Sequence, residues 1–522
     1  MTTPATRILT NAEVHTLTDA DGTIDPSRTD ESADEVHEAV AIRDGRIVRV
    51  GSAYELEFLE GVETEVIDCD GRVVLPGFID AHVHMEMLGQ YQVHADLSEA
   101  DSAAACQARL AAQLEDDHEW VVGFGYDESD WDDPHYLTRE ELDAVSEERP
   151  VAAIRIDMHT ASLNGVALER LREAMPAEDV ETEGGEPTGV VVETAAEVVW
   201  KAIDPDLEET RELLIAAQAY ANARGVTGIH DMVRNSHAPR AYRDLRADDE
   251  LTLRVRLNYW SDHLEAVREA GLRTNVGDPF VRMGAIKTYT DGSMGSRTAR
   301  LFEPYEDGDG RGLWVVDPEA LRAFVADADG DGYQLTAHAI GDEAIEEVLA
   351  AYETTDDPGA ARHRIEHVEL ATDDHVDRLA ETGVVASMQP NFLKWADEGG
   401  LYDQRVGVDR RNRADRLRTL ADAGVALAFG SDCMPLDPLG GIHHAVTAPH
   451  EEQRLTVTEA IRAYTLGAAY AGFDEDRLGT IEPGKCADLV VLEASPWERP
   501  KRIDEIDVAM TLVDGEVVYD GR

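Results

Sequence analysis

Histidine, lysine and aspartate side chains with the chemistry of metal ligands recur along the chain at the ends of apolar runs. His82 and His84 are two residues apart near the end of the first run, so strand geometry projects both imidazoles from the same face. Two neutral imidazoles placed in this way can share one metal ion. The spacing alone is a weak signal, because 18 histidines in 522 residues give about 0.6 such pairs by chance. A purely structural pair explains it equally well.

Further candidate ligands follow other apolar runs, at positions where barrel enzymes place their reacting groups. They are Lys287, His338, His367 and Asp432. Lys287 is informative because the chain has only five lysines, and this one lies inside a β-rich run where an unpaired ammonium is costly. The structural alternative is a salt bridge between Lys287 and a neighbouring carboxylate such as Asp291. For Asp432 the alternative is a strand-end cap.

An alternation of apolar strands and helical segments must position these side chains. Eight short runs read as buried strands separated by helical patterns, which is typical of a parallel α/β sheet or barrel. Eight such units close a TIM (β/α)8 barrel, which we expect over residues 76–471. The predicted strands span residues 77–84, 225–231, 253–258, 284–289, 334–338, 364–367, 384–389 and 425–432.

The two chain ends share a different, β-rich texture. Both alternate short β-rich runs with turn signals, and Asp514-Gly515 reads as a hairpin turn. Two β-rich ends that flank a long middle predict one small discontinuous β-domain. We expect it to comprise residues 1–75 plus 472–522.

The interval between the first and second predicted strands is far longer than one crossover helix requires. It predicts an insertion after barrel strand 1 at about residues 95–222, an elaborated lid or subdomain over the barrel mouth. Strand-like pieces occur at residues 120–126 and 151–156, and a hairpin-like run at 188–192. The segment from Glu178 to Glu186 reads as a charged loop.

The acidic excess is spread over the whole chain. Lys and Arg number 47 against 107 Asp and Glu, a formal net charge of −60, which argues against a nucleic-acid partner. Such a coat is typical of proteins from halophiles, whose cytoplasm holds molar salt and where the Debye length falls to about 3 Å. We therefore expect destabilisation at low salt. An ordinary acidic protein is the alternative.

The lengths of the apolar runs and the spacing of the cysteines indicate the cellular compartment. No apolar run reaches the ~20 residues of a bilayer span, and the N-terminus does not read as a signal peptide, so we expect a cytoplasmic protein without a membrane partner. The four cysteines lack a Cys-x-x-Cys spacing, which argues against a disulfide framework and a thiolate zinc site. Cys433 adjoins Asp432, yet strand alternation would turn its thiol to the opposite face.

Several motifs, taken in their order along the chain, resemble the amidohydrolase superfamily of metal-dependent hydrolases. The resemblance is specifically to the branch of N-substituted formamide deformylases, amidohydrolase family 3. The closing run, residues 479–492, looks like that superfamily's return into a β-sandwich. The other matching segments are residues 75–89, which contain Pro-Gly-Phe-Ile-Asp-Ala-His-Val-His, and residues 286–299, 338–344, 364–367, 388–390 and 430–432.

The resemblance implies a centre of two divalent metal ions, usually zinc. Its ligands would be His82, His84 and Asp432 on one ion, and His338 and His367 on the other. Lys287, N6-carboxylated to a carbamate, would bridge the two ions. A neutral lysine amine can capture carbon dioxide, and two nearby cations stabilise the resulting negative charge.

The same resemblance implies a hydrolase of non-peptide carbon–nitrogen bonds, acting on a small-molecule amide of the N-formyl or N-acyl amine type. A hydroxide bridging the ions would attack the carbonyl, with Asp432 as the general base that passes the proton to the leaving nitrogen. The alternatives are a superfamily hydrolase or deaminase of a cyclic amide or amidine, and a non-catalytic scaffold, which should lack the ligands present here. A homodimer is common for this architecture.

Other residues are weaker candidates for substrate binding. Gln389 could hydrogen-bond substrate or satisfy a loop backbone. His159, in the insertion, resembles a position that reaches the pocket in this branch, against the alternative of a packed histidine. Asp291 and Arg297 could orient a ligand or substrate, or form an ion pair. His230, which ends the second strand, is expected to support the ligands or to face the substrate.

Overall fold

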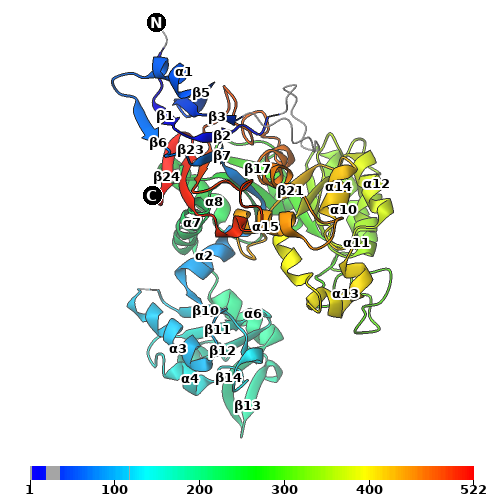
Figure 1. Ribbon diagram of the computed structural model, residues 1–522. Coiled ribbons are helices and arrows are strands. Elements are labelled where there is room, and N and C mark those ends of the chain that lie inside the picture. Colours follow the sequence, from blue (N-terminus) through cyan, green and yellow to red (C-terminus); the bar gives the residue numbers. More distant parts are fainter. Residues whose placement is uncertain (1–2, 19–35, 117) are drawn as a thin grey trace. The chain divides into compact units, whose positions relative to one another are not determined.

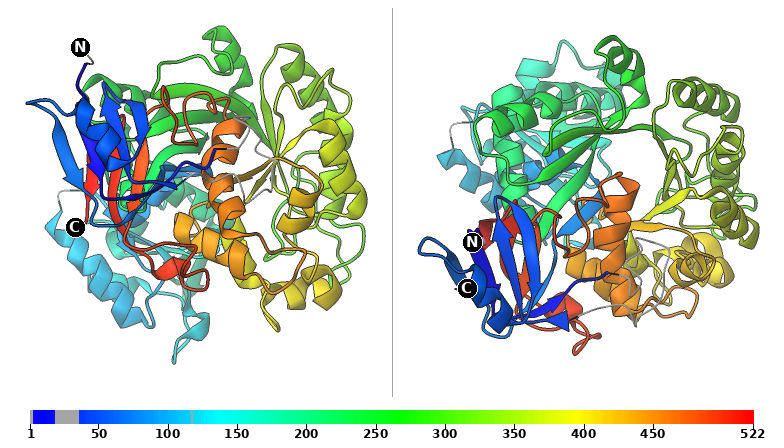
Figure 2. Two further views of the ribbon diagram at one scale, coloured as in Figure 1. Left: turned by 45° about the horizontal axis from the view of Figure 1, so that its top comes forward. Right: turned by 90° about the horizontal axis from the view of Figure 1, so that it is seen from above.

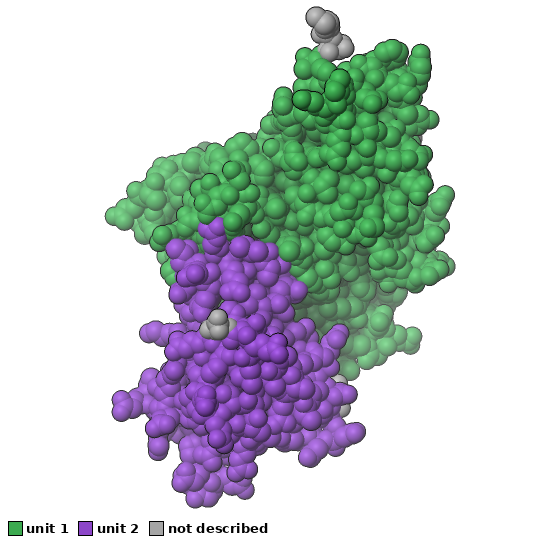
Figure 3. All heavy atoms as spheres, turned by 90° about the vertical axis from the view of Figure 1, so that its left-hand side faces the viewer, with its two compact units in different colours: residues 1–84, 218–522 green, residues 85–217 purple. Residues whose placement is uncertain are grey.

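A computed structural model of the chain describes residues 3–18, 36–116 and 118–522. It contains two compact units, which Figure 3 shows in different colours. One unit comprises residues 1–84 and 218–522, and the other comprises Met85–Ala217. The first unit holds a barrel and the sheets formed by the two chain ends. The second unit is the insertion predicted after the first barrel strand.

The barrel of the first unit consists of eight parallel strands in the order β21-β20-β19-β18-β17-β16-β15-β8. Two of them, β17 and β21, are labelled in Figure 1. Each strand overlaps a run predicted from the sequence, and the predicted TIM barrel is confirmed. Every residue of β8 and β15 is buried, the polar ones included, as expected for strands that are covered on both faces. The strands are β8 (Phe78–Val83), β15 (Val226–Val233), β16 (Arg254–Trp260), β17 (Val281–Tyr289), β18 (Leu335–Ala339), β19 (Arg364–His367), β20 (Val385–Met388) and β21 (Leu427–Phe429).

The first and last strands of the barrel, β8 and β21, meet through a side chain and through close backbone packing. The carboxylate of buried Asp80 accepts hydrogen bonds from the N–H groups of His82 and Ser431, both at 3.0 Å. The N–H of Asp432 donates to the carbonyl of His82 at 2.8 Å. A Cβ at Gly430 would lie 2.4 Å from the His82 nitrogen, so this position requires glycine. The contacts hold His82 and Asp432 side by side.

Helices alternate with the strands and lie outside them, as α10, α11 and α12 do in Figure 2. In α11 the buried residues Ile345, Val348, Leu349 and Tyr352 form one apolar face at helical spacing. α12 begins with a capping box at Thr372 and ends at Gly383 in the left-handed conformation. The helices that follow β14 (Glu186–Val192) and α6 (Glu193–Ala202) along the chain are α7 (Leu207–Asn222), α8 (Ala238–Ala247), α9 (Leu264–Glu269), α10 (Pro318–Gly330), α11 (Asp342–Tyr352), α12 (Asp373–Thr382), α13 (Leu401–Arg411), α14 (Leu417–Asp422), α15 (Pro438–Thr447), α16 (Val457–Arg462) and α17 (Ala468–Ala471).

The two chain ends form two further sheets, as the sequence predicts. Their orders are β5-β4-β1-β6 and β24-β23-β22-β7-β2-β3, and a shared core includes Leu9, Val40, Leu489 and Met510. The guanidinium of Arg7 donates to the carbonyl of Gly515 and so joins them. The strands are β1 (Arg7–Thr10), β2 (Glu13–His15), β3 (Val36–His37), β4 (Ala39–Arg43), β5 (Arg46–Gly51), β6 (Glu65–Asp68), β7 (Val73–Pro76), β22 (Leu489–Leu492), β23 (Val508–Val513) and β24 (Glu516–Asp520).

The boundary assigned to this β-domain, residues 1–75 plus 472–522, stays a prediction. Residues 1–2 and 19–35 of the predicted range lie outside the described residues. The hairpin predicted at Asp514-Gly515 joins β23 to β24, and both turn residues have positive φ, 52° and 78°. The short α1 (Ala53–Leu56), capped by Ser52, packs against β4 and β5.

The second unit contains a sheet in the order β13-β14-β12-β11-β10-β9 with an apolar cluster on each face. Val121 and Val122 illustrate the division, because neighbouring residues of one strand enter different clusters. Its strands are β9 (Ala95–Asp96), β10 (Val121–Tyr126), β11 (Val151–Arg155), β12 (Thr160–Leu163), β13 (Val180–Glu183) and β14 (Glu186–Val192). Its helices are α2 (Met85–Val93), α3 (Ala103–Ala112), α4 (Arg139–Asp143), α5 (Gly165–Leu171) and α6 (Glu193–Ala202).

One prediction for the insertion is wrong. The segment from Glu178 to Glu186 is not a charged loop, because Val180–Glu183 forms β13 and pairs with β14. Gly184 and Gly185 turn the chain with φ values of 62° and 91°. The last three residues of β13, Glu181 to Glu183, are exposed. The strand therefore lacks the apolar pattern by which a strand is recognised in sequence.

Candidate metal centre

Three predicted ligands meet where β8 and β21 end. The His84 Nε2 atom lies 3.3 Å from Asp432 Oδ1, and the His82 Nε2 atom lies 3.6 Å from the same oxygen. One ligand atom from each of the three residues lies within 4.8 Å of the other two. Two imidazoles and a carboxylate at this separation fit the donor set of one divalent ion. The structure therefore brings His82, His84 and Asp432 together.

The other predicted ligands come from the neighbouring strands β17, β18 and β19. The ring centroids of His338 and His367 are 4.5 Å apart, and those of His82 and His367 are 5.0 Å apart. Lys287 Nζ, His338 Nδ1 and His367 Nδ1 are buried and form no hydrogen bond with any described residue. Buried polar atoms normally have a partner. Unpartnered donor atoms on adjacent strands are the arrangement that a bound metal would satisfy.

Lys287 is only 1% exposed, and its surroundings do not match the structural alternative considered for it. Burial lowers the pKa of Lys287 to about 8, against the attraction of Glu366 and Asp432. The alternative, a salt bridge to Asp291, is wrong. The Asp291 carboxylate instead accepts hydrogen bonds from the backbone N–H groups of Arg300, Ile340 and Gly341.

Glu366, which the sequence analysis did not single out, orients His82. The Nδ1 atom of His82 donates to Glu366 Oε2 at 2.7 Å, which leaves Nε2 free on the side of Asp432. Arg364 lies 2.7 Å from the other carboxylate oxygen. Burial alone would raise the pKa of Glu366, but Arg364 and His82 hold it well below its usual range. The carboxylate therefore fixes the tautomer and direction of the His82 ring.

His338 is held in the complementary way. Its Nε2 atom donates to the carbonyl of Gly292 at 3.0 Å, so the unprotonated Nδ1 atom is the one available to a metal. Burial and the charge of Lys287 lower the pKa of His338 to about 3. The imidazole is therefore neutral, as a metal ligand must be. Tyr289 stacks on the ring with centroids 4.2 Å apart.

Backbone strain accompanies two of the candidate ligands. His367 has φ of 77° and Asp432 has φ of 52°. Residues other than glycine rarely adopt this left-handed backbone region. Arg364 and Glu366, two residues apart on β19, share the face that points into the barrel. Regular strand alternation would turn the next residue, His367, to the opposite face. The left-handed backbone instead lets His367 contact His82 and His338. Strain of this kind is typical of functional sites.

The candidates for substrate binding have different surroundings. Gln389, at the end of β20, is buried, and its Oε1 atom is without a hydrogen-bond partner in the described part of the chain. Arg297 is exposed and forms a two-point ion pair with Asp307 at 3.0 and 2.8 Å. Asp291 is fully buried against backbone amides. His159 belongs to the second unit, is 73% exposed and lies 3.6 Å from Glu193. Their roles toward substrate stay predictions.

The cysteine beside Asp432 is held by a ligand's backbone. Cys433 Sγ lies 3.3 Å from both the nitrogen and the carbonyl oxygen of His84. The sequence predicts the direction of the Cys433 thiol from strand alternation. That rule does not apply here, because β21 ends at Phe429 and Cys433 itself has φ of 57°. Burial raises the pKa of this thiol well above its usual range, which opposes a role as nucleophile.

Comparison with known proteins identifies the family. The sequence profile described as the amidohydrolase family matches residues 65–519, which include every residue of this centre. The chain belongs to the amidohydrolase family. It is therefore a hydrolase, and the resemblance read from its motifs is confirmed.

Individual relatives agree over nearly their whole length. The chain is 32% identical to YtcJ of Bacillus subtilis (strain 168), covering 92% of this chain and 96% of the relative. It is 27% identical to the N-substituted formamide deformylase of Arthrobacter pascens, and the match covers 94% of this chain and 97% of the relative. An uncharacterized metal-dependent hydrolase from Pyrococcus furiosus has a similar structure, with a TM-score of 0.80, 28% identity, and coverage of 94% and 99%. No helix of the described residues is long and apolar enough to cross a membrane.

Proposed function

We propose that this amidohydrolase cleaves the amide bond of a small N-formyl or N-acyl amine at a centre of two divalent metal ions, zinc by preference. One observation carries the proposal: at the carboxyl end of the barrel, buried imidazole and amine donor atoms have no partner among the described residues. These atoms adjoin the cluster of His82, His84 and Asp432. The similarity to an N-substituted formamide deformylase supports the substrate class.

The donor set fits such a pair of ions. His82, His84 and Asp432 would hold one ion, and His338 and His367 would hold the other. Lys287 lies on β17 next to β18, and its amine is buried without a partner among the described residues. As a carbamate it would supply a further carboxylate ligand. Metal ions bound here would lower the pKa of a water molecule and polarise the carbonyl of the substrate.

Asp432 is the proposed proton carrier. Burial raises the pKa of its carboxyl, but His82, His84 and His367 outweigh burial and hold it below the usual range. The ionised carboxylate can accept a proton from the attacking water and give it to the leaving nitrogen. Its φ of 52° and its backbone bond to His82 fix the carboxylate beside the ligands. A positioned acid–base group of this kind contributes about 10²–10⁴-fold to rate.

A substrate panel tests the proposal. Purified enzyme is offered N-formyl amines, N-acetyl amines, cyclic amides and amidines, and the released acid and amine are quantified together with bound metal. We expect N-formyl or N-acyl amines to be hydrolysed, and Asp432→Asn to lower kcat by about 10²–10⁴-fold in protein that retains metal. Turnover of only cyclic amides or amidines would establish the alternative chemistry. Failure of metal-loaded enzyme on every class would contradict the proposed substrate class.

A further inference from the structure

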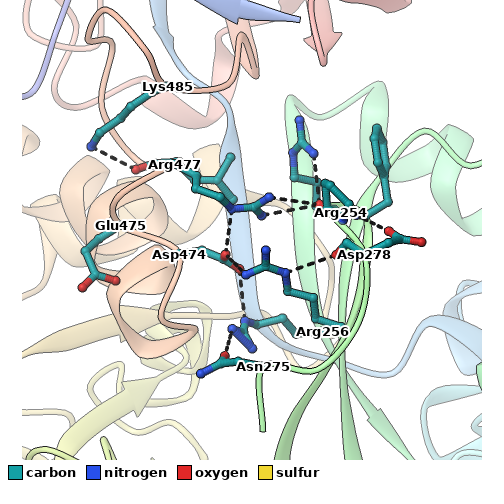
Figure 4. A network of polar contacts seen from close by, with 12 residues as sticks. Arg254, Arg256, Asn275, Asp278, Asp474, Glu475, Arg477 and Lys485 are labelled. Atoms are coloured by element: carbon teal, nitrogen blue, oxygen red, sulfur yellow. Dashed lines mark hydrogen bonds and ion pairs between the residues drawn. The ribbon is translucent and has the colours of Figure 1, made fainter.

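At the opposite end of the barrel from the candidate metal centre, arginine side chains gather around a small cavity (Figure 4). Arg254 and Arg256 lie on β16 and Arg282 lies near the start of β17, while Arg477 follows α17. The cavity has a volume of about 20 Å³, enough for one water-sized species. In a chain with a net charge of −60, a buried concentration of positive charge is unusual.

One carboxylate serves three of these guanidinium groups. Asp474 accepts from Arg256 Nε at 3.2 Å, from Arg282 Nη1 at 3.0 Å and from Arg477 Nε at 3.0 Å. All four residues line the cavity. Arg254 is neutralised separately, since its guanidinium forms a two-point pair with Asp488 at 2.5 and 2.9 Å. The Asp474 cluster of Arg256, Arg282, Arg477 and Asp474 therefore carries an excess of positive charge.

The excess charge is partly removed from water. Arg256 is 5% exposed, and its remaining bonds go to uncharged acceptors, the carbonyl of Met283 and the side chain of Asn275. Burial, together with the neighbouring charges of Arg282 and Arg477, lowers the pKa of Arg256 to about 10. A pKa of about 10 still leaves the guanidinium protonated at neutral pH. Uncompensated buried charge is costly, and a counter-ion would relieve it.

His230 offers a further hydrogen-bond donor to the same cavity. Arg364 Nη1 donates to His230 Nδ1 at 2.8 Å, which places the proton of the neutral imidazole on Nε2. Burial and Arg364 hold the pKa of His230 well below its usual range. A Cβ at Gly472 would lie 2.6 Å from Arg256 Nε and 2.8 Å from His230 Nε2, so glycine is required beside these two groups.

We propose that the Asp474 cluster and His230 bind one monatomic anion, chloride, at the amino end of the barrel. The donors are guanidinium N–H groups, of which each arginine has five, and the imidazole N–H. The small volume suits a monatomic anion. The positive charge distinguishes the site from a simple water site. The anion would link β16 and β17 to the segment after α17, which carries Asp474 and Arg477.

Anomalous diffraction tests the site directly. Crystals of the wild-type protein are grown with bromide in place of chloride, and data are collected at the bromine absorption edge. We expect a peak among Arg256, Arg282 and Arg477 at the cavity. Ordinary density for water there without an anomalous peak would overturn the proposal, and this result does not depend on any variant folding.

Thermal unfolding tests the site in solution. The unfolding temperature is measured as chloride replaces gluconate at constant ionic strength, which keeps general screening unchanged. We expect a saturable rise for wild type and a chloride midpoint at least about tenfold higher for Arg477→Gln. Arg502→Gln, which removes an exposed arginine paired with Glu505, should respond as wild type does. Equal responses of wild type and Arg477→Gln would contradict the proposal.

Discussion

At the scale of single residues, the hydrogen bond between Glu366 and His82 is the contact that most clearly prepares a ligand. Replacing Glu366 with Gln keeps the size of the side chain and removes the charge that fixes the His82 tautomer. We expect Glu366→Gln to weaken metal binding by about 10–100-fold, measured by competition with a chelator. Glu346→Gln is the matched control, because Glu346 faces His375 at 3.3 Å on helices outside the strands. Equal metal affinity in both variants would refute the role of Glu366.

The sequence predicts that the candidate ligands converge, but it does not predict the side chains that support them. The six candidate ligands all lie at the ends of apolar runs, and the strand ends of a barrel converge. They are His82, His84, Lys287, His338, His367 and Asp432. Glu366 was visible in the motif from Arg364 to His367, yet only the fold shows that it reaches His82 on another strand. The positive φ values of His367 and Asp432 break the alternation rule, so side-chain direction there could not be derived from spacing.

At the scale of elements, the contact between β8 and β21 depends on Gly430. A Cβ at this position would lie 2.4 Å from the His82 nitrogen, so Gly430→Ala must separate the two strands. We expect a loss of about 1–3 kcal/mol in the free energy of unfolding, together with weaker metal binding, because His82 and Asp432 move apart. Denaturant titration and metal analysis measure the two effects.

Gly308→Ala provides the comparison for this prediction. A Cβ at Gly308 meets no atom within 4 Å, so that variant should unfold and bind metal as wild type does. If Gly430→Ala matched Gly308→Ala in both measurements, the close approach of β8 and β21 would not be what positions the ligands.

The elements predicted best from sequence were the buried ones. The barrel strands read as short apolar runs because both of their faces are covered. The hairpin of β13 and β14 was missed in part because the residues of β13 are mostly exposed and acidic. Its structure depends on pairing such as that of Val180 with Val191, and on two glycines at the turn. Pairing between segments carries no periodic signal within either segment.

At the scale of the whole molecule, the net charge of −60 governs the response to salt. The Debye length grows from about 3 Å at 1 M salt to about 10 Å at 0.1 M, so repulsion among carboxylates extends further at low salt. We expect the denaturant concentration at the midpoint of unfolding to fall as the potassium gluconate concentration is lowered from 1 M to 0.1 M. A midpoint that does not depend on salt would show an ordinary acidic protein. Gluconate excludes the chloride site from this measurement.

The central claim is that six residues at the carboxyl end of the barrel hold two metal ions, with Lys287 between them. The most direct test is the metal content per chain of protein purified in molar salt, for wild type, Lys287→Ala and Lys201→Ala, the last being an exposed lysine of α6. The account predicts about two ions in wild type and Lys201→Ala, and fewer in Lys287→Ala. Folded wild-type protein that binds no metal after reconstitution, or a Lys287→Ala variant with undiminished metal, would contradict it.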